Sequence, residues 1–256
     1  MVRGGAGGSV RGVSAPLFLV ENLPSGSFFT LDGAEGHHAA TVQRLRAGET
    51  LILADGRGGT AFAEVVAVGK GSVDVAVGER GQEPAAAPRL TVAQGIAKGD
   101  RGELAVQAMT EVGVDEILPW AASRSVAQWR GDRGHRARDK WASTAREAAK
   151  QARRSWLPLV GGDPDCSTKQ IGARIGEASA AFVLHEEATE RLSTVGLPDA
   201  GDIVLVVGPE GGISDAEVTA FRDAGALPVR LGSTVLRTST AGVAALAVLA
   251  TRLGRW

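Results

Sequence analysis

The fold class is decided by one stretch of the sequence, Ile203-Val204-Leu205-Val206-Val207-Gly208-Pro209-Glu210-Gly211-Gly212-Ile213-Ser214-Asp215-Ala216-Glu217. Residues 203–207 are apolar without alternation, which is typical of a strand buried on both faces of a parallel sheet. Ser214 and Glu217 have the spacing of a capping box, which predicts that a helix begins there. Three glycines at the end of the strand let the backbone approach a ligand closely, at the sheet edge where α/β proteins usually bind one. An ordinary tight turn is the alternative, but a turn this short rarely needs three glycines and a carboxylate.

A second loop of this kind is Leu231-Gly232-Ser233-Thr234-Val235-Leu236-Arg237-Thr238-Ser239-Thr240-Ala241, between a predicted strand over Val229–Leu231 and a predicted helix over about Ser239–Leu253. Either Thr238 or Ser239 can cap that helix. Arg237 precedes the helix, where the macrodipole disfavours a cation, so we interpret it as a residue that holds a phosphate or a substrate carbonyl. A surface arginine paired with a nearby acid is the alternative.

The rest of the chain after Pro88 continues the alternation of strands and helices. Further strands are predicted at Leu90–Ala97, Ile117–Trp120 and Ala180–Leu184. A helix is predicted with one apolar face formed by Leu104, Ala108, Met109 and Val112, and a longer helix over about Gly134–Arg154. This alternation predicts an α/β domain over residues 89–256.

The part before residue 83 has a different pattern. It contains four strand-like runs, Leu17–Val20, Leu51–Ala54, Ala61–Val68 and Val73–Val77, and one short helix is expected over about Ala34–Leu45. The glycine-rich stretch Asp55–Gly59 predicts a hairpin turn. These features predict a small, mainly β domain over residues 16–82.

Two segments outside these domains carry no pattern of buried faces. Residues Gly81–Pro88 are rich in glycine, proline and alanine, and a linker is predicted at residues 83–88. Residues 1–15 contain five glycines and no acid. We expect a flexible N-terminal tail there, since a helix is unfavourable through so many glycines, and a transit peptide is the alternative.

The charges are distributed unevenly. The whole chain has 28 basic and 29 acidic residues, which excludes a uniformly basic nucleic-acid coat. Residues 120–156, however, contain ten basic and three acidic residues, a net charge of +7, which leaves −8 for the remainder.

In the long helix, an apolar stripe is predicted from Trp141, Ala145, Ala148 and Ala152, with Trp141 in the core. The opposite face is basic, and it either follows a phosphate backbone or is a solvated helix surface. It consists of Lys140, Arg146, Lys150, Arg153 and Arg154.

Metal, disulfide and membrane functions are not expected. The single cysteine, Cys166, cannot form an internal disulfide or supply a zinc cluster, so a cytoplasmic, metal-free protein is predicted. The apolar run Ala241–Ala250 is about half the length of a bilayer span. Residues Gly56–Ala61 match a loose dinucleotide-binding pattern, but a strand follows them where a helix is required, so a nicotinamide enzyme is not favoured.

Several motifs together resemble one family. The loops Gly208–Gly212 and Leu236–Ala241, with their spacing, resemble the SPOUT superfamily of RNA methyltransferases, and in particular the family that methylates N3 of a uridine in 16S ribosomal RNA. Four shorter segments are similar to other motifs of that family in the same order: His37–Arg46, Lys98–Arg101, Thr110–Gly113 and Ser123–Ser125.

The resemblance implies a C-terminal trefoil-knotted α/β domain, the SPOUT methyltransferase domain, and a small N-terminal PUA-like β-barrel domain that binds RNA. It implies S-adenosylmethionine as the cofactor, 16S rRNA of the small ribosomal subunit as the partner, and a homodimer. It also implies a set of cofactor-binding residues: Leu184, His185, Glu186, Gly208, Pro209, Glu210, Gly211, Gly212, Leu231, Gly232, Val235, Leu236, Arg237 and Thr238.

The resemblance further implies roles for individual side chains. Arg237 is expected to stabilise the uracil oxygens and Glu210 to accept the proton. RNA contacts are expected from Arg44, Arg46, Arg101 and Arg124.

The chain departs from the family pattern in two places. Ser239 stands where the family has a glutamate, and Ala108 and Met109 replace a lysine-containing helix segment. Two alternatives therefore stay open: methylation of another RNA atom, such as a ribose 2′-hydroxyl or a guanine, and a non-catalytic RNA-binding assembly factor.

Overall fold

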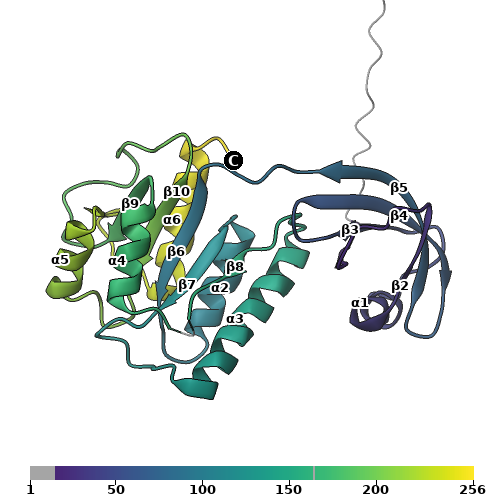
Figure 1. The fold of residues 1–256 in the computed structure, drawn as a ribbon, viewed down its shortest axis with the longest axis horizontal. Helices are drawn as coiled ribbons and strands as arrows, with labels where there is room; N and C mark the ends of the chain where they lie inside the picture. Colours follow the sequence, from purple (N-terminus) through teal and green to yellow (C-terminus); the bar gives the residue numbers. More distant parts are fainter. Residues whose placement is uncertain (1–14, 164) are drawn as a thin grey trace, which may run out of the picture. The chain divides into compact units, whose positions relative to one another are not determined.

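The computed structural model describes residues 15–163 and 165–256, so the predicted N-terminal tail, except Ala15, lies outside the described residues. The chain forms two compact units, one up to Glu83 and one from Pro84 onward, and the predicted linker at residues 83–88 spans the boundary. Figure 1 labels helices and strands of both units, which are described separately.

The first unit is built on a five-stranded sheet. Its strands are β1 (Leu17–Leu19), β2 (Phe28–Leu31), β3 (Thr50–Ala54), β4 (Gly59–Val68) and β5 (Val73–Gln82), paired in the order β1-β3-β4-β5-β2. β1 runs parallel to β3, and the other pairs are antiparallel. Phe18, Leu51, Leu53 and Val75 form the centre of its apolar core.

The hairpin predicted at Asp55–Gly59 is confirmed. The carboxylate of Asp55 accepts hydrogen bonds from the backbone N–H groups of Arg57 (2.7 Å) and Gly59 (2.9 Å). Gly56 and Gly58 have positive φ angles of 71° and 92°, which glycine adopts without steric cost. The turn is therefore specified by the residues within it.

Three predictions for this unit need correction. The expected single helix is a short α1 (Gly33–His37) continued by a π-helical turn, η1 (His38–Val42), in which the N–H of Gln43 donates to the carbonyl of His38. β2 was not predicted, because only Leu31 of its four residues is buried and no alternation results. β5 runs from Val73 through Gln82, five residues beyond the predicted end of the strand at Val77, and its last residues pair with β4.

The second unit is the predicted α/β fold. Its six strands are β6 (Arg89–Gly95), β7 (Glu116–Trp120), β8 (Leu159–Val160), β9 (Ala180–Leu184), β10 (Asp202–Val207) and β11 (Leu227–Val229). They form a parallel sheet in the order β11-β9-β10-β6-β7-β8. Its helices are α2 (Arg101–Glu111), α3 (Gly131–Gln151), α4 (Thr168–Glu177), α5 (Asp215–Asp223) and α6 (Thr238–Arg252).

The central strand β10 faces apolar layers on both sides. Leu205 packs into a cluster that contains side chains of α2, α3 and α6, whereas Val204 and Val206 pack into a second cluster with α4 and α5. Burial on both faces explains why residues 203–207 show no polar alternation. In the residues that the structure describes, no helix is both long and apolar enough to cross a membrane.

The buried face of α2 agrees with the predicted one at Met109 and differs from it at Leu104. Leu104 is 53% exposed, and the residues that face the core are Gly102, Ala105, Val106, Met109 and Thr110. A Cβ atom at Gly102 would lie 2.6 Å from the ring of Trp141, so the glycine lets α2 approach α3 closely. Close approach of this small-residue face turns Leu104 outward.

The apolar stripe predicted on α3 is confirmed for Trp141, Ala145 and Ala148, but Ala152 lies beyond the helix and is exposed. Two residues of the predicted basic face are structural. Lys150 is 7% exposed and pairs with Glu147. Arg154 donates hydrogen bonds to the carbonyls of Thr110 and Val114. The solvated basic face is therefore smaller than the sequence predicts.

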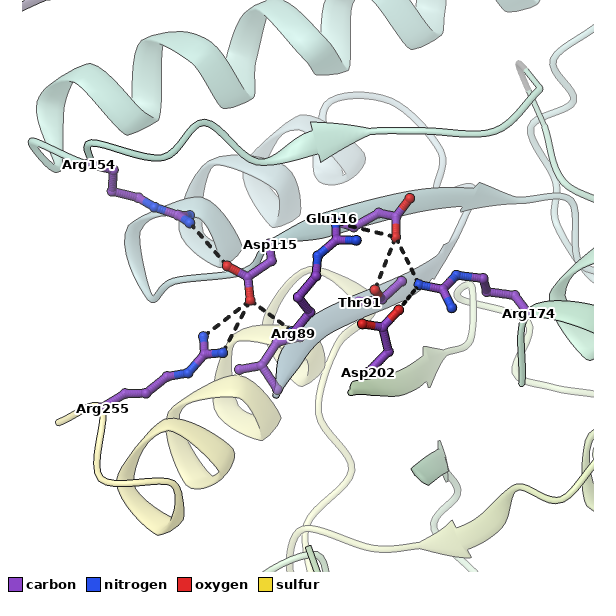
Figure 2. A network of polar contacts seen from close by, with 9 residues as sticks. Arg89, Thr91, Asp115, Glu116, Arg154, Arg174, Asp202 and Arg255 are labelled. Atoms are coloured by element: carbon purple, nitrogen blue, oxygen red, sulfur yellow. Dashed lines mark hydrogen bonds and ion pairs between the residues drawn. The ribbon is translucent and has the colours of Figure 1, made fainter. Parts of the chain in front are cut away.

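A polar network closes the edge of the sheet where β6, β7 and β10 begin (Figure 2). Arg174 of α4 pairs with Glu116 and with Asp202, the first residues of β7 and β10. Asp115 accepts hydrogen bonds from the N–H of Leu90 and from the guanidinium of Arg255, and also pairs with Arg154. These contacts bind the termini of several elements to one another, at the edge opposite the glycine loops.

Candidate active site

A cavity of about 580 Å³ lies at the carboxyl ends of β9, β10 and β11. Three loops line it. They are Leu184–Glu187 at the end of β9, Gly208–Ile213 after β10, and residues 230–232 and 234–237 after β11. The carboxyl ends of parallel strands share one edge of the sheet, and this edge is where ligands of α/β proteins bind. The cavity therefore lies where the two loop sequences predicted a site.

All fourteen residues expected to bind the cofactor line this one cavity, and so do Arg101 and Arg124. The other two expected RNA contacts, Arg44 and Arg46, are exposed in the first unit. Sequence reasoning missed Glu187, Arg230 and Thr234, which also line the cavity. Each of the three lies beside a residue of the same loop that was expected to bind the cofactor, and this neighbourhood could have indicated them.

The glycine loop is held in place by close backbone packing. A Cβ atom at Gly211 would lie 2.7 Å from the carbonyl oxygen of Arg124, and one at Gly208 would lie 2.8 Å from Ile213. Gly212 has a φ of +74°. Behind the loop, a Cβ atom at Gly95 would lie 2.5 Å from the backbone nitrogen of Pro209. Glycine is thus required here by contacts within the protein.

Thr238 connects the two predicted loops. Its hydroxyl donates a hydrogen bond of 2.8 Å to the carbonyl oxygen of Gly208. The prediction that Thr238 or Ser239 caps α6 is wrong: Arg237 is the N-cap residue, and its side chain makes no capping hydrogen bond. The Thr238 side chain is instead directed at the neighbouring loop.

Gln94 is a site-supporting residue that sequence reasoning missed. It is fully buried in β6, and its Nε2 donates to the hydroxyl of Thr238 (3.0 Å) and to the carbonyl of Gly95 (3.2 Å). A buried amide needs hydrogen-bond partners, so a polar residue inside the apolar run Leu90–Ala97 was the signal that could have found it.

The candidate catalytic side chains lie on the cavity rim. Oε1 of Glu210 accepts from the N–H of Lys98 (3.2 Å) and pairs with Arg101 (3.4 Å). Arg237 is exposed, and within the described residues its guanidinium has no hydrogen bond or ion pair. The same ranges, 15–163 and 165–256, contain no group of three or more His, Cys, Asp or Glu side chains that could hold a metal ion.

Glu217 fixes the loop that follows β7 against α5. Its carboxylate accepts hydrogen bonds from the N–H (2.6 Å) and hydroxyl (3.0 Å) of Ser123, and from the N–H and hydroxyl of Ser214 (2.9 and 2.7 Å). Burial alone would raise the pKa of Glu217, but these hydrogen bonds outweigh it and lower the pKa below its ordinary value. The predicted capping box of Ser214 and Glu217 is confirmed.

Comparison with known families agrees with this geometry. Residues 84–250 match the family described as the RNA methyltransferase domain, and residues 31–78 match the RNA methyltransferase PUA domain. The first match alone covers more than half of the chain. The chain belongs to the RNA methyltransferase family.

Individual proteins are also similar to this RNA methyltransferase over most of its length. It is 45% identical to the ribosomal RNA small subunit methyltransferase E of Mycobacterium bovis, over 94% of each chain. It is 31% identical to the protein of the same name from Bacillus subtilis, over 90% of this chain and 91% of that one.

A solved structure has the same fold. It is the ribosomal RNA small subunit methyltransferase E of Neisseria gonorrhoeae bound to S-adenosyl methionine, with a TM-score of 0.81 and 26% identity, over 93% of this chain and 98% of that one. The expected combination of a PUA-like N-terminal domain and a parallel-sheet methyltransferase domain is confirmed.

Proposed function

We propose that this RNA methyltransferase transfers the methyl group of S-adenosylmethionine to N3 of a uridine in 16S ribosomal RNA, in the cytoplasm. The observation that carries the proposal is the cavity of about 580 Å³, on which three loops converge in a member of this family. Relatives named as small-subunit ribosomal RNA methyltransferases, one of them solved with S-adenosyl methionine, support the cofactor and the substrate class.

The cavity suits this cofactor in size and chemistry. Its volume lies within the range of roughly 300–1,000 Å³ typical of small-molecule sites. Gly208 and Gly211 present backbone without side chains to it. Four arginines and four carboxylates line it, so neither sign of charge dominates: Arg101, Arg124, Arg230, Arg237, Glu186, Glu187, Glu210 and Asp215. When bound, S-adenosylmethionine supplies a methyl group attached to a positively charged sulfur.

The chain's own side chains have two tasks in this reaction. Uridine N3 is a weak acid that carries a proton at neutral pH, and its loss places negative charge on the uracil oxygens. We assign the guanidinium of Arg237, which has no partner within the described residues, to stabilise that charge, the kind of contact that contributes most to such reactions. Glu210 is the carboxylate within the glycine loop, and we assign it as the proton acceptor. Its Oε1 is held by Arg101 and the N–H of Lys98, which leaves Oε2 for the proton.

Ser239 removes the other candidate acceptor. It stands where the resembled family has a glutamate, so the carboxylate must come from another position. This departure makes Glu210 the residue on which the proposed proton transfer depends.

The proposal includes a homodimer. In α6, Gly242 and Ala245 are buried inside the chain, where Gly242 packs against Met109 of α2, whereas Ala241 and Ala244 are half-buried. The buried small residues of α6 thus pack within the chain, and the half-buried ones remain for a contact with a second copy. Light scattering on the purified protein would give the mass directly, and a monomer at micromolar concentration would contradict this part.

The test of the proposed activity uses radiolabelled methyl transfer from S-adenosylmethionine to 16S rRNA and to small ribosomal subunits. Incorporation should coincide with a primer-extension stop, because an N3 methyl group blocks base pairing, and mass spectrometry should find 3-methyluridine. Incorporation into a ribose or a guanine would contradict the assigned atom. RNA binding without incorporation would indicate an assembly factor instead.

A further inference from the structure

The chain carries a row of unpaired arginines beside the cavity, and we propose that it binds the phosphate backbone of the substrate RNA. The row consists of Arg124, Arg130, Arg133 and Arg136, and is called the arginine row below. The inference rests on the proposed function, because it names the surface by which RNA reaches the cavity. It differs from the basic face predicted by sequence, which lies toward the other end of α3.

The guanidinium groups of the arginine row are available. All four residues are exposed. Among the described residues, Arg130, Arg133 and Arg136 have no side-chain hydrogen bond or ion pair, and Arg124 donates only one long bond (3.4 Å) to the carbonyl of Ile213. By contrast, the neighbouring Arg138 and Lys140 pair with Asp139 and Glu103. The row therefore keeps its full positive charge for a partner.

Three members of the row lie at the start of α3. Arg130 is the N-cap residue of α3, and Arg133 and Arg136 follow at intervals of three residues. Residues three apart on a helix are neighbours, with Cβ atoms about 5–6 Å apart. A ridge of this kind can contact successive phosphates of one strand.

The topology places this ridge beside the cavity. β6 lies between β7 and β10 and runs parallel to both, so the loop after β7 leaves the same sheet edge as the glycine loop after β10. Arg124, in that loop, lines the cavity, and its carbonyl packs against Gly211. The loop then leads directly into the first turn of α3.

An aromatic contact holds the loop on its helix. The ring of Trp129, one residue before Arg130, packs edge-to-face against Trp141 at a centroid distance of 4.8 Å. Trp141 is itself buried in the core. The backbone that carries Arg130, Arg133 and Arg136 is thus attached to the core at its start.

The charge of the rest of the chain favours RNA at this surface. Residues 121–139 contain five arginines and two acids, Asp132 and Asp139, and Asp139 pairs with Arg138 outside the row. Residues 15–83, which include the PUA domain, contain five basic and nine acidic residues. A polyanion is attracted to the arginine row far more than to the average surface of the first unit.

The experiment compares two double variants of equal net charge in the full-length protein. The first, Arg133→Gln/Arg136→Gln, removes half of the row. The second, Arg153→Gln/Arg222→Gln, removes exposed arginines at the ends of α3 and α5 that lie toward the opposite sheet edge. Binding of transcribed 16S rRNA is measured by fluorescence anisotropy at several salt concentrations, with melting temperature and S-adenosylmethionine affinity alongside.

We expect the first variant to bind RNA about tenfold more weakly at 0.1 M salt, with the slope of log K against log salt reduced by roughly 1.4. The control variant should bind as the wild type, and both should keep their melting temperature and cofactor affinity. Arg133→Lys/Arg136→Lys should restore binding because it keeps both charges. A KM for RNA that rises while kcat is retained would agree with this result.

Other outcomes would overturn the proposal. They are equal losses in the two double variants, no loss in either, or wild-type binding to phosphatidylserine vesicles in place of RNA. Methyl transfer by the wild-type protein is measured separately. If the wild type transfers no methyl group, the proposed activity is wrong, and the RNA-binding comparison still tests the arginine row. If the wild type is active and the first variant binds RNA normally, only the proposed binding surface is wrong.

Discussion

The hydroxyl of Thr238 donates to the carbonyl oxygen of Gly208 at 2.8 Å and accepts from Nε2 of Gln94 at 3.0 Å. A hydroxyl can donate and accept at once, so one side chain joins the loop after β11, the loop after β10 and the end of β6. Both hydrogen bonds are shielded from water, since the side chains of Thr238 and Gln94 are buried. The shape of the cavity therefore depends on a residue that resembles a helix cap in sequence.

Replacing Thr238 by valine, which keeps the shape and removes the hydroxyl, should loosen both loops. Leaving the Gly208 carbonyl and the Gln94 amide unsatisfied costs about 1–3 kcal/mol of stability. We expect a lower melting temperature and roughly tenfold weaker binding of S-adenosylmethionine by calorimetry. Thr238→Ser keeps the hydroxyl and should stay close to wild type. If the valine variant bound the cofactor normally, the hydrogen bonds of Thr238 would not be needed for cofactor binding.

Gly95 allows a test of the glycine loop from behind, without touching the cavity lining. A Cβ atom at Gly95 would meet backbone atoms of Pro209 and Gly208 at 2.5 and 2.9 Å, and backbone cannot move aside cheaply. Gly95→Ala should therefore destabilise the protein by about 1–3 kcal/mol and weaken cofactor binding.

Gly196→Ala is the matched control, because a Cβ atom there meets nothing within 4 Å and its φ is not positive. Its stability should change by less than about 1 kcal/mol. Urea unfolding of both variants decides the point, and equal midpoints would show that the Gly95 contact is unimportant.

Glu217 should make stability depend on acid pH. Its pKa is lowered from the ordinary 4.5, so its stabilising contribution is fully present above pH 4.5 and is lost as pH falls through the lower folded-state pKa. Glu217→Gln should be less stable by about 2 kcal/mol at pH 7, since hydrogen bonds to a charged acceptor are lost. The difference from wild type should shrink below pH 4.5, measured by urea unfolding at several pH values.

Asp223→Asn, at the exposed end of the same helix, is the control for this titration. It should run parallel to wild type across the same pH range. A Glu217→Gln variant whose deficit stayed constant down to pH 3 would mean that the carboxylate is not held by Ser123 and Ser214 in solution.

Arg237→Ala should act on the chemical step. Removing a donor that faces developing negative charge typically lowers kcat about 10²–10³-fold. The measurement is the single-turnover rate of methyl transfer to 16S rRNA with saturating cofactor. Arg222→Ala removes an equal charge outside the cavity and should leave this rate unchanged. A full rate in Arg237→Ala would refute the role of the guanidinium while leaving the proposed activity standing.

Much of the fold follows from local pattern. Residues 203–217 predict a buried parallel strand, a glycine loop and a capped helix, and the structure has β10, the cavity loop and α5 with Ser214 as its cap. The missed helix α4 begins with a similar capping box, Ser167 and Gln170, and has Ile171 and Ile175 at a spacing of four. A helix could have been predicted from this pattern, whereas the two-residue strand β8 has no pattern of its own.

The errors concern orientation and partners. Leu104 was assigned to the core because it is apolar at a helical spacing, but the closeness of α2 to Trp141 is set by Gly102. Their charge predicts that Lys150 and Arg154 lie on a face that either follows a phosphate backbone or is solvated, but Lys150 is buried beside Glu147 and Arg154 donates to the carbonyl of Thr110. Residue type predicts average burial, and a particular contact can reverse it.

The sequence by itself determined most of the elements, the position of the two loops and the family, because these depend on residue patterns and on interactions between neighbours a few positions apart. Only the tertiary structure decided that Thr238 joins Gly208, that Gln94, 144 residues away from Thr238, supports both, and that Arg124 leads from the cavity to α3. These contacts depend on the order of strands in the sheet, which brings distant segments to one edge and which no local pattern encodes.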